Sequence, residues 1–331
     1  MGNDIGKKRT FLQGIQNLTQ RPSFPAFTIF LVLLIVNAIL QPRFFNYRSI
    51  RSNIMSFTPL IMASIAQGII ILSGSLDLSL GSAISLFTVF IAYYMTDTNA
   101  PLMIIIGFGI TIVISGFING LLIGRLKLPA LITTFATSAV YLGTAMIILP
   151  VAGGYVPRSF YQFYKGSLFT YIPYSALILI AGILIWYVFS KSRAYRYIYA
   201  SGSSEEGAYA SGIKVWKTRL IAHLFASLFI FIAGMCVLMM TATGEYRTGQ
   251  SYTLNSVAAV VIGGIALTGG RGSIVGAIFG AATLGILNNI IFFSGASSYM
   301  QILAKGVIIV LALMVSAVPQ MVRNRQKVLG K

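Results

Sequence analysis

The chain has 331 residues, of which 56% are hydrophobic and 9% are charged, and its mean hydropathy is +0.84. This composition excludes a soluble globular protein. A spanning helix needs about 20 mostly apolar residues. The composition therefore leaves room for about eight to ten spans and for no sizeable soluble domain. The net charge of +18 comes from 24 basic and six acidic residues, but the basic residues stand in short clusters between apolar runs, which favours membrane orientation over nucleic-acid binding.

Apolar runs bounded by glycine, proline or charge predict an all-α, polytopic membrane bundle of about ten spans. Residues 1–25 are polar and basic and form a predicted cytoplasmic segment, followed by one transmembrane domain over 26–318 and a cytoplasmic tail over 319–331. The first apolar run ends without a small-residue cleavage site, so we interpret it as an uncleaved span rather than a processed signal peptide. The predicted spans are 26–41, 54–73, 78–95, 101–124, 129–150, 173–190, 218–240, 255–268, 273–293 and 299–318.

An even number of spans puts both termini on one side of the membrane. With the N-terminus inside, 17 of the 24 basic residues fall in inside segments, which predicts cytoplasmic N- and C-termini. Arg43, Arg48 and Arg51 are the exception, because they fall outside unless they lie on an interfacial helix. The outside loop 151–172 is rich in aromatics and glycine, which is typical of a membrane-interface belt and also compatible with a docking face for an external partner.

Two glycine-rich polar interruptions break the apolar pattern, at 73–82 and 268–273. Irregular backbone at membrane depth is tolerated only where it is packed in protein or lines a cavity, so we expect broken or half helices here, near the bundle centre and along a translocation pathway. The pathway residues that we predict within them are Ser73, Gly74, Asp77, Ser79, Thr268, Gly269 and Gly270.

Asp77 is the only acid in the apolar part of the chain, and an ionisable group there indicates a function. It either binds solute or a proton, or it holds the interruption together by capping a half-helix or by pairing with a basic residue such as Arg271. The nearby serines favour the architectural role, because they offer capping hydrogen bonds.

Uncharged polar residues inside apolar runs either join helices or face a hydrophilic solute. Their number, beside so few charges, favours a neutral solute. They are Gln67, Asn119, Asn255, Asn288, Asn289 and Gln301, of which we assign Gln67, Asn119, Asn255 and Asn288 to the pathway. Gly272, Gly276 and Gly280 are spaced four apart, which predicts close helix packing.

The longest inside stretch, 191–217, contains a predicted two-turn helix. Ser203 or Ser204 can cap it, Glu205 and Glu206 suit the positive end of its dipole, and Gly212 can stop it. Such a helix is either a connector or a lever on which another protein acts. The candidate coupling residues are Gly202, Ser204, Glu205, Glu206, Ala208, Ala210 and Gly212.

Three blocks of the chain resemble the ribose-type permeases of bacterial ABC importers. Residues 73–82 are similar to that family's Ser-Gly-Gly-Ile-Asp-Leu-Ser-Val-Gly-Ser. Residues 199–215 resemble its cytoplasmic Tyr-Ala-x-Gly-x-Asn-x-x-Ala-Ala-x-x-x-Gly-Ile segment, and 261–306 is similar to its longest block almost position by position. The chain departs from the family at Ser75, Ser204 and Gly207, where Gly, Asn and Ala are preferred.

The resemblance implies a type II-importer-like permease of the bacterial inner membrane. It implies pairing with a second copy or a related permease, cytoplasmic ABC ATPase subunits below, and an external solute-binding protein that delivers a sugar or similar small polar solute. ATP-driven alternating access would follow, with 191–217 as the coupling segment. The chain has no Gly-x-x-x-x-Gly-Lys-Ser/Thr loop, so we expect ATP hydrolysis on another chain and no cofactor here.

The alternatives are an ion-coupled carrier of a small polar solute and a membrane-embedded enzyme. One membrane carboxylate gives the carrier thin support. One histidine, His223, and one cysteine, Cys236, provide no catalytic set, no metal-ligand spacing and no intrachain disulfide, so we expect no enzyme activity and no metal.

Overall fold

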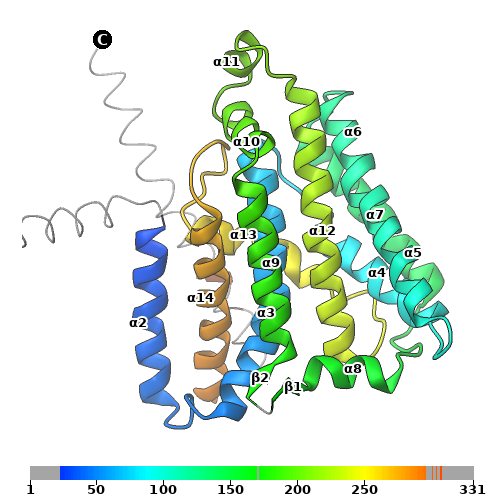
Figure 1. The fold of residues 1–331 in the computed structure, drawn as a ribbon, viewed down its shortest axis with the longest axis vertical. Coiled ribbons are helices and arrows are strands. Elements are labelled where there is room, and N and C mark those ends of the chain that lie inside the picture. Colours follow the sequence, from blue (N-terminus) through cyan, green and yellow to red (C-terminus); the bar gives the residue numbers. More distant parts are fainter. Residues whose placement is uncertain (1–22, 170, 296–299, 301–302, 304–305, 308–331) are drawn as a thin grey trace, which may run out of the picture.

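The computed structural model describes residues 23–169, 171–295, 300, 303, 306 and 307. Within them the regular secondary structure is helical apart from one short antiparallel hairpin and an isolated bridge between Gly153 and Gly244, so the predicted all-α class is confirmed (Figure 1). The elements are α2 Phe24–Leu40, α3 Tyr47–Leu72, α4 Leu80–Tyr94, α5 Ala100–Thr111, the π-helix η1 Ile112–Ile118, α6 Asn119–Gly124, α7 Ala130–Ile148, α8 Arg158–Lys165, β1 Ser167–Leu168, β2 Ile172–Pro173, α9 Tyr174–Ser190, α10 Arg193–Ser203, α11 Glu205–Ala210, α12 Val215–Thr241, α13 Gln250–Ile262 and α14 Ile274–Phe293.

Five continuous helical segments among the described residues are long and apolar enough to cross a membrane: α3, α5–η1–α6, α7, α12 and α14. The bent pair α9 and α10, with an angle of 76° between them, adds a sixth, and α2 and α4 are shorter apolar helices. Nine of the ten predicted spans coincide with described helices, while the tenth, 299–318, lies almost entirely outside the described residues. The multi-pass architecture is therefore confirmed, but the count of ten is not.

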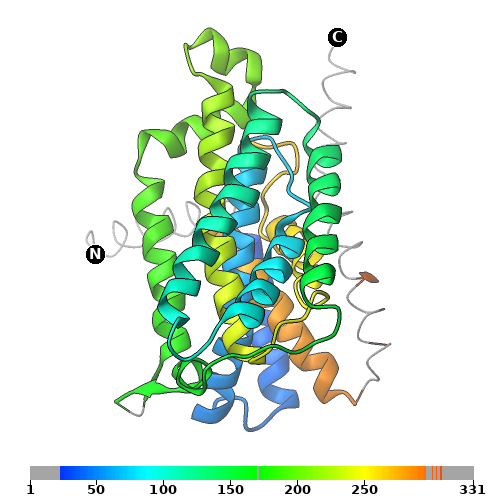
Figure 2. The same ribbon diagram turned by 90° about the vertical axis from the view of Figure 1, so that its right-hand side faces the viewer.

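The core of the bundle is the contact between α3 and α12, which pack against each other more extensively than any other described pair. Every residue of α3 from Thr58 to Leu72 is buried. Around this pair, α2 and α14 lie on one side, with Phe27 and Phe279 rings 5.0 Å apart, and α5, α6 and α7 lie on the other (Figures 1 and 2). The second half of α3 is therefore enclosed by other helices on all of its faces.

The span α5–η1–α6 contains one π-helical stretch, Ile112–Ile118, where it approaches α12. A Cβ on Gly116 would lie 2.8 Å from Ser227 Oγ, and a Cβ on Gly120 would lie 3.1 Å from Leu220 Cα. Both glycines therefore permit close backbone packing beside the widened turn. Single π-turns inside α-helices are frequent at functional sites.

The two ends of the bundle differ. Helices α10 and α11 lie at one end, and α8 and the β1–β2 hairpin lie at the opposite end, with the start of α2 pointing toward the α10–α11 end (Figure 1). The loop 151–172 and the coupling stretch 191–217 are thus on opposite faces, as the span order predicts. The structure also contains α10, a helix that the sequence analysis did not separate from its surroundings.

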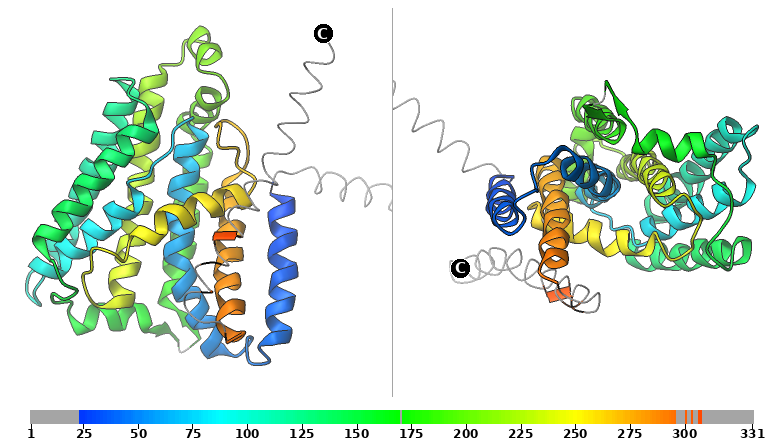
Figure 3. Two further views of the ribbon diagram at one scale, coloured as in Figure 1. Left: turned by 180° about the vertical axis from the view of Figure 1, so that it is seen from behind. Right: turned by 90° about the horizontal axis from the view of Figure 1, so that it is seen from below.

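Two short helices, α4 and α13, contact each other inside the bundle and stop short of one end (Figure 3). The non-helical segments 73–79 and 263–273 connect α3 to α4 and α13 to α14. Both predicted interruptions are therefore breaks between helices. We call them the first break (73–79) and the second break (263–273).

Two of the three glycines predicted to pack helices do so on α14. A Cβ on Gly276 would collide with the carbonyl oxygen of Gly263, and one on Gly280 with that of Ala259, so α14 lies directly against the end of α13. Gly272 differs, because it precedes α14 with φ +116° and approaches the backbone of Ile265. It belongs to the second break and not to a helix face.

Gly280→Ala should lower the thermal stability of the protein in detergent, because overpacking a helix contact costs roughly 1–3 kcal/mol. Gly143→Ala is the matched control, since it lies in α7 with nothing within 4 Å of its Cβ position. The melting temperature of Gly143→Ala should be unchanged or slightly raised, because alanine favours helix. Equal melting temperatures for Gly280→Ala and the unmodified protein would contradict the close packing.

Candidate functional site

Asp77 lies fully buried in the first break. Its Oδ1 accepts hydrogen bonds from the Ser79 backbone N–H at 2.7 Å and from Ser79 Oγ at 2.6 Å. The carboxylate thus organises the turn that enters α4, in the manner of an N-terminal cap. Its other oxygen, Oδ2, has no hydrogen-bond partner among the described residues.

The alternative in which Asp77 pairs with Arg271 does not match the geometry. The one ion pair within the described part of the chain joins Glu205 and Arg219. The contacts of Asp77 are therefore local hydrogen bonds, with one carboxylate oxygen left over.

Side chains of α6 and α7 extend the hydrogen-bond network of the first break. Asn119 donates from Nδ2 to Ser79 Oγ at 2.8 Å, and the Thr134 hydroxyl oxygen accepts from the Leu78 N–H at 3.0 Å. Tyr141 donates to the Ile114 carbonyl in η1 at 2.7 Å and lies 3.5 Å from Asn119 Oδ1. The break is therefore bonded to two neighbouring helices rather than exposed to lipid.

The first turn of α4 is held between α7 and α13. Gly81 N–H donates to Thr253 Oγ1 at 3.0 Å, and Ser82 Oγ lies 2.8 Å from Ser138 Oγ. Gly249, just before α13, donates its N–H to Ser85 Oγ at 3.0 Å. Because both short helices are bonded through backbone groups, α4 and α13 form one connected unit.

The second break depends on left-handed glycines. Gly264, Gly269, Gly270 and Gly272 all have φ between +63° and +116°, a region that side chains disfavour. Gly270 donates its N–H to the carbonyl of Leu72 at 3.1 Å, directly before the first break. The second break is therefore hydrogen-bonded to the last residue of α3, which directly precedes the first break.

Both breaks also touch the end of α10. A Cβ on Gly202 would collide with the Leu72 carbonyl oxygen and lie 2.7 Å from Gly270 N, and a Cβ on Gly269 would lie 2.8 Å from Gly74 Cα. We call Gly74, Gly202, Gly269 and Gly270 the glycine junction. Close backbone contact between three segments is possible here because none of the four residues has a side chain.

Hydrogen bonds of α10 fix this junction. Ser203 Oγ lies 3.1 Å from the Gly270 carbonyl, and Tyr199 donates its hydroxyl to the Gly272 carbonyl at 2.9 Å. The end of α10 is therefore bonded directly to the second break. The tyrosine and serine of the cytoplasmic block have direct structural roles that the sequence analysis did not foresee.

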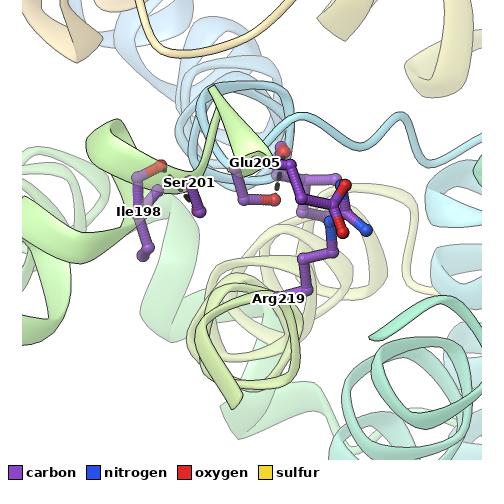
Figure 4. Close-up of polar contacts among 6 residues, drawn as sticks. Ile198, Ser201, Glu205 and Arg219 are labelled. Atoms are coloured by element: carbon purple, nitrogen blue, oxygen red, sulfur yellow. Dashed lines mark hydrogen bonds and ion pairs between the residues drawn. The ribbon is translucent and has the colours of Figure 1, made fainter. Parts of the chain in front are cut away.

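The predicted helix of the coupling stretch is present as α11, Glu205–Ala210. Ser204 is its N-cap, accepting from the Gly207 N–H at 3.1 Å, and Gly212 follows with φ +77°. Glu205 in its first turn forms a 2.8 Å ion pair with Arg219 of α12 (Figure 4). α11 is thereby tied to one of the two central helices.

Ala208 is the buried contact of α11, whereas Ala210 and Glu206 are exposed. The helix therefore presents one polar, open face beyond the bundle, at the top of Figure 1.

The predicted pathway residues fall into two groups. Ser73, Asp77, Ser79 and Asn119 are brought together around the first break. Gly74, Gly269 and Gly270 instead meet Gly202 at the end of α10.

The other predicted residues are dispersed. Gln67 is fully buried in α3 with no hydrogen-bond partner in the described residues, and Asn255 and Asn288 are half-buried on α13 and α14. Thr268 is exposed. Asn289 donates to Asn53 Oδ1 at 2.8 Å and joins two helices, and Gln301 lies outside the described residues.

Sequence reasoning missed the hydroxyl groups that surround α4. Thr134, Ser138 and Thr253 look like ordinary helix residues in the sequence, and their only signal is a run of hydroxyls in apolar context. His223 is buried without a hydrogen-bond partner in the described chain, and the described residues contain no cluster of three metal-ligating side chains.

Asp77→Asn should retain most of the stability of the protein, since the amide oxygen can still accept from Ser79. Asp77→Ala should lose roughly 1–3 kcal/mol, because buried donors of Ser79 are left without an acceptor. Asn255→Ala is the control, as Asn255 makes no hydrogen bond to another described residue. Thermal unfolding in detergent measures all three, and equal stability of the Asp77 variants would contradict the capping role.

Comparison with known proteins places the chain in a family. Residues 49–315 match a family described as "Branched-chain amino acid transport system / permease component". The ribose import permease of Bacillus subtilis (strain 168) is 32% identical over 287 residues, covering 86% of this chain and 89% of the relative. The ribose import permease of Escherichia coli (strain K12) is 30% identical over 292 residues, covering 86% and 90%.

The fructose import permease of Rhizobium meliloti is 28% identical over 331 residues, covering 96% of this chain and 90% of the relative. No solved structure matches. The matches extend over both breaks, the coupling stretch and the helices that hold them. The chain therefore belongs to the family of sugar ABC transporter permeases, as a multi-pass membrane subunit of an importer.

Proposed function

We propose that this chain moves a sugar or similar small polar solute into the cell by ATP-driven alternating access. The observation that carries the proposal is the glycine junction, where the end of α10 contacts both breaks through backbone atoms. The relatives import ribose and fructose, and a related permease of Haemophilus influenzae imports galactose and methyl galactoside. The chain itself catalyses no covalent step.

The proposed setting is the bacterial inner membrane, with both termini in the cytoplasm. Residues 26–318 would be one transmembrane domain, with 1–25 and 319–331 inside and 191–217 as the coupling segment. The start of α2 points toward the α10–α11 end, and the inside segments carry 17 of 24 basic residues, which supports this orientation.

Three kinds of partner fit the two ends of the bundle. Cytoplasmic ABC ATPase subunits would dock on α11, whose polar face is open. An external solute-binding protein would dock on the opposite end, over α8 and the hairpin, where Phe169 and Tyr171 are 82% and 78% exposed. A second copy or a related permease would pair with this chain in the membrane.

The proposed transmission starts at α11 and divides. The Glu205–Arg219 ion pair passes a displacement of α11 to α12. The junction passes a displacement of α10 to Leu72 and Gly270. Leu72 directly precedes the first break, and Gly270 lies in the second. Because α4 and α13 are hydrogen-bonded to each other, both half-helices would then move as one unit and re-aim the solute path.

The proposed solute path follows the hydroxyl and amide groups around α4 and α13. Uncharged groups suit a neutral solute, because sugar hydroxyls can both donate and accept hydrogen bonds. Gln67, Asn255 and Asn288 have no hydrogen-bond partner among the described residues and are the candidates for solute contact. Asp77 is assigned to the architecture of the first break, so Asp77→Asn should keep much of the transport activity.

The proposed docking of the ATPase on α11 can be tested by crosslinking. A cysteine at Tyr209, 79% exposed on α11, should crosslink to the co-expressed cognate ATPase. A cysteine at Tyr171 is the matched control, equally exposed at the opposite end. Absence of any crosslink from Tyr209→Cys, or solute uptake by the permease without an ATPase, would overturn the importer mechanism and favour an ion-coupled carrier.

Gly202→Ala should leave binding of the ATPase intact and reduce solute uptake. A Cβ at this position collides with Leu72, so the junction must open while α11 stays intact. We expect normal co-purification of the ATPase and solute uptake reduced at least about tenfold, a loss comparable to other close-packing errors near a site.

Gly207→Ala, on α11, is the control for this prediction. Its Cβ would meet only the Ser204 side chain, at 3.2 Å, and alanine is the residue that the family pattern prefers there. Uptake into proteoliposomes measures both variants. Full uptake by Gly202→Ala would mean that the junction does not carry the coupling.

A further inference from the structure

A groove of about 1140 Å³ opens at the α10–α11 end of the bundle. One wall is the connection between α6 and α7, with Arg125 and Lys127. The other wall is formed by α11 and the start of α12, with Glu206, Lys214 and Lys217. The groove therefore lies directly beside the helix that we assign to ATPase coupling.

The two walls are fixed to each other. A Cβ on Gly124 would lie 2.7 Å from the Trp216 carbonyl oxygen, so the end of α6 rests on the start of α12. The Arg125 guanidinium stacks 4.9 Å from the centre of the Trp216 ring, and Lys217 Nζ lies 5.5 Å from the same ring from the other wall. Such cation–π contacts hold the basic groups over the aromatic base of the groove.

The charge of the groove is positive. Arg125, Lys127, Lys214 and Lys217 are all exposed and, in the described chain, none of them is in an ion pair. Of the two glutamates in the lining, Glu205 is already neutralised by Arg219. Four basic groups against one free carboxylate attract a negatively charged occupant.

We propose that this groove binds an acidic segment of the ATPase subunit, so that the α6–α7 connection is a second docking element beside α11. This inference rests on the proposed function and names a further part of the same partner's surface. The groove is continuous with α11, because Glu205, Glu206 and Tyr209 of that helix line it, so a partner seated on α11 would meet the groove. Its basic groups would pair with carboxylates of that partner.

The second element also reaches the first break by a short path. α6 begins with Asn119, whose amide donates to Ser79 Oγ, and Ser79 is bonded to Asp77. A displacement of the α6–α7 connection therefore acts on the entry to α4 independently of the glycine junction. The ATPase would then hold the break from two sides.

Crosslinking separates this inference from the proposed function. Lys127→Cys and Tyr209→Cys are made singly in an otherwise cysteine-free chain, with Cys236→Ala, and each is co-expressed with the cognate ATPase. Crosslinks from both positions support the inference. A crosslink from Tyr209→Cys alone overturns it and leaves the coupling role of α11 intact, whereas no crosslink from either position overturns both.

Charge reversal tests the chemistry of the occupant. Lys127→Glu should weaken binding of the purified ATPase to the permease in nanodiscs by about tenfold. It should also flatten the salt dependence of that binding, because screened charges drive it. Arg158 is an exposed basic residue on α8 at the opposite end, and the variant Arg158→Glu should bind the ATPase as tightly as the unmodified chain does.

Nanodisc composition distinguishes a protein occupant from a lipid one. The defect of Lys127→Glu should be the same in purely zwitterionic phosphatidylcholine and in discs containing phosphatidylglycerol. A defect that appears only with the anionic lipid would mean that the groove holds lipid headgroups, and would overturn the proposal. Unchanged ATPase affinity in both compositions would also overturn it.

Discussion

The structure depends on one constraint: backbone polar groups at membrane depth must find partners inside the protein. Two segments of this chain leave the helix, and local backbone hydrogen bonds, such as that from the Ala266 N–H to the Arg271 carbonyl, satisfy only some of their N–H and C=O groups. Their other partners are the end of α3 and neighbouring side chains. The Leu72 carbonyl accepts from Gly270, the Leu78 N–H donates to Thr134, and the Gly81 N–H donates to Thr253. The breaks therefore determine which helices must be neighbours.

The same constraint explains why the contact with α10 consists of glycines. Three irregular segments can share one small volume only when their backbones touch, and any Cβ at Gly202, Gly269 or Gly270 would displace the others. A joint of this kind has little slack, because it has no flexible side chains to absorb a shift. That stiffness suits the transmission of movement from α10 to the short helices α4 and α13.

Few charged side chains lie inside the bundle, whereas several lie at its α10–α11 end. Asp77 is the one fully buried carboxylate among the described residues, and it is bonded to its own turn. Around α4 and α13 the polar groups are hydroxyls and amides, which suit a neutral solute. The basic side chains of the groove beside α11 are exposed, so they are available to select a partner.

The sequence by itself determined the helical class, the positions of the two breaks and the capped helix α11. Apolar run length, glycine clusters and the Ser204–Glu206 cap are local signals, and each reports on residues adjacent in the chain.

Only the tertiary structure decided what the breaks contact. Gly74, Gly269 and Gly270 were expected along the pathway, yet they meet Gly202, and Thr134, Ser138 and Thr253 were not singled out at all. A glycine that permits a distant backbone to approach looks the same in the sequence as one that ends a helix. Likewise, a hydroxyl bonded within its own helix looks the same as one that accepts from a backbone N–H 56 or 172 residues away. The partners of unpaired backbone groups are fixed by three-dimensional packing, because no local pattern encodes them.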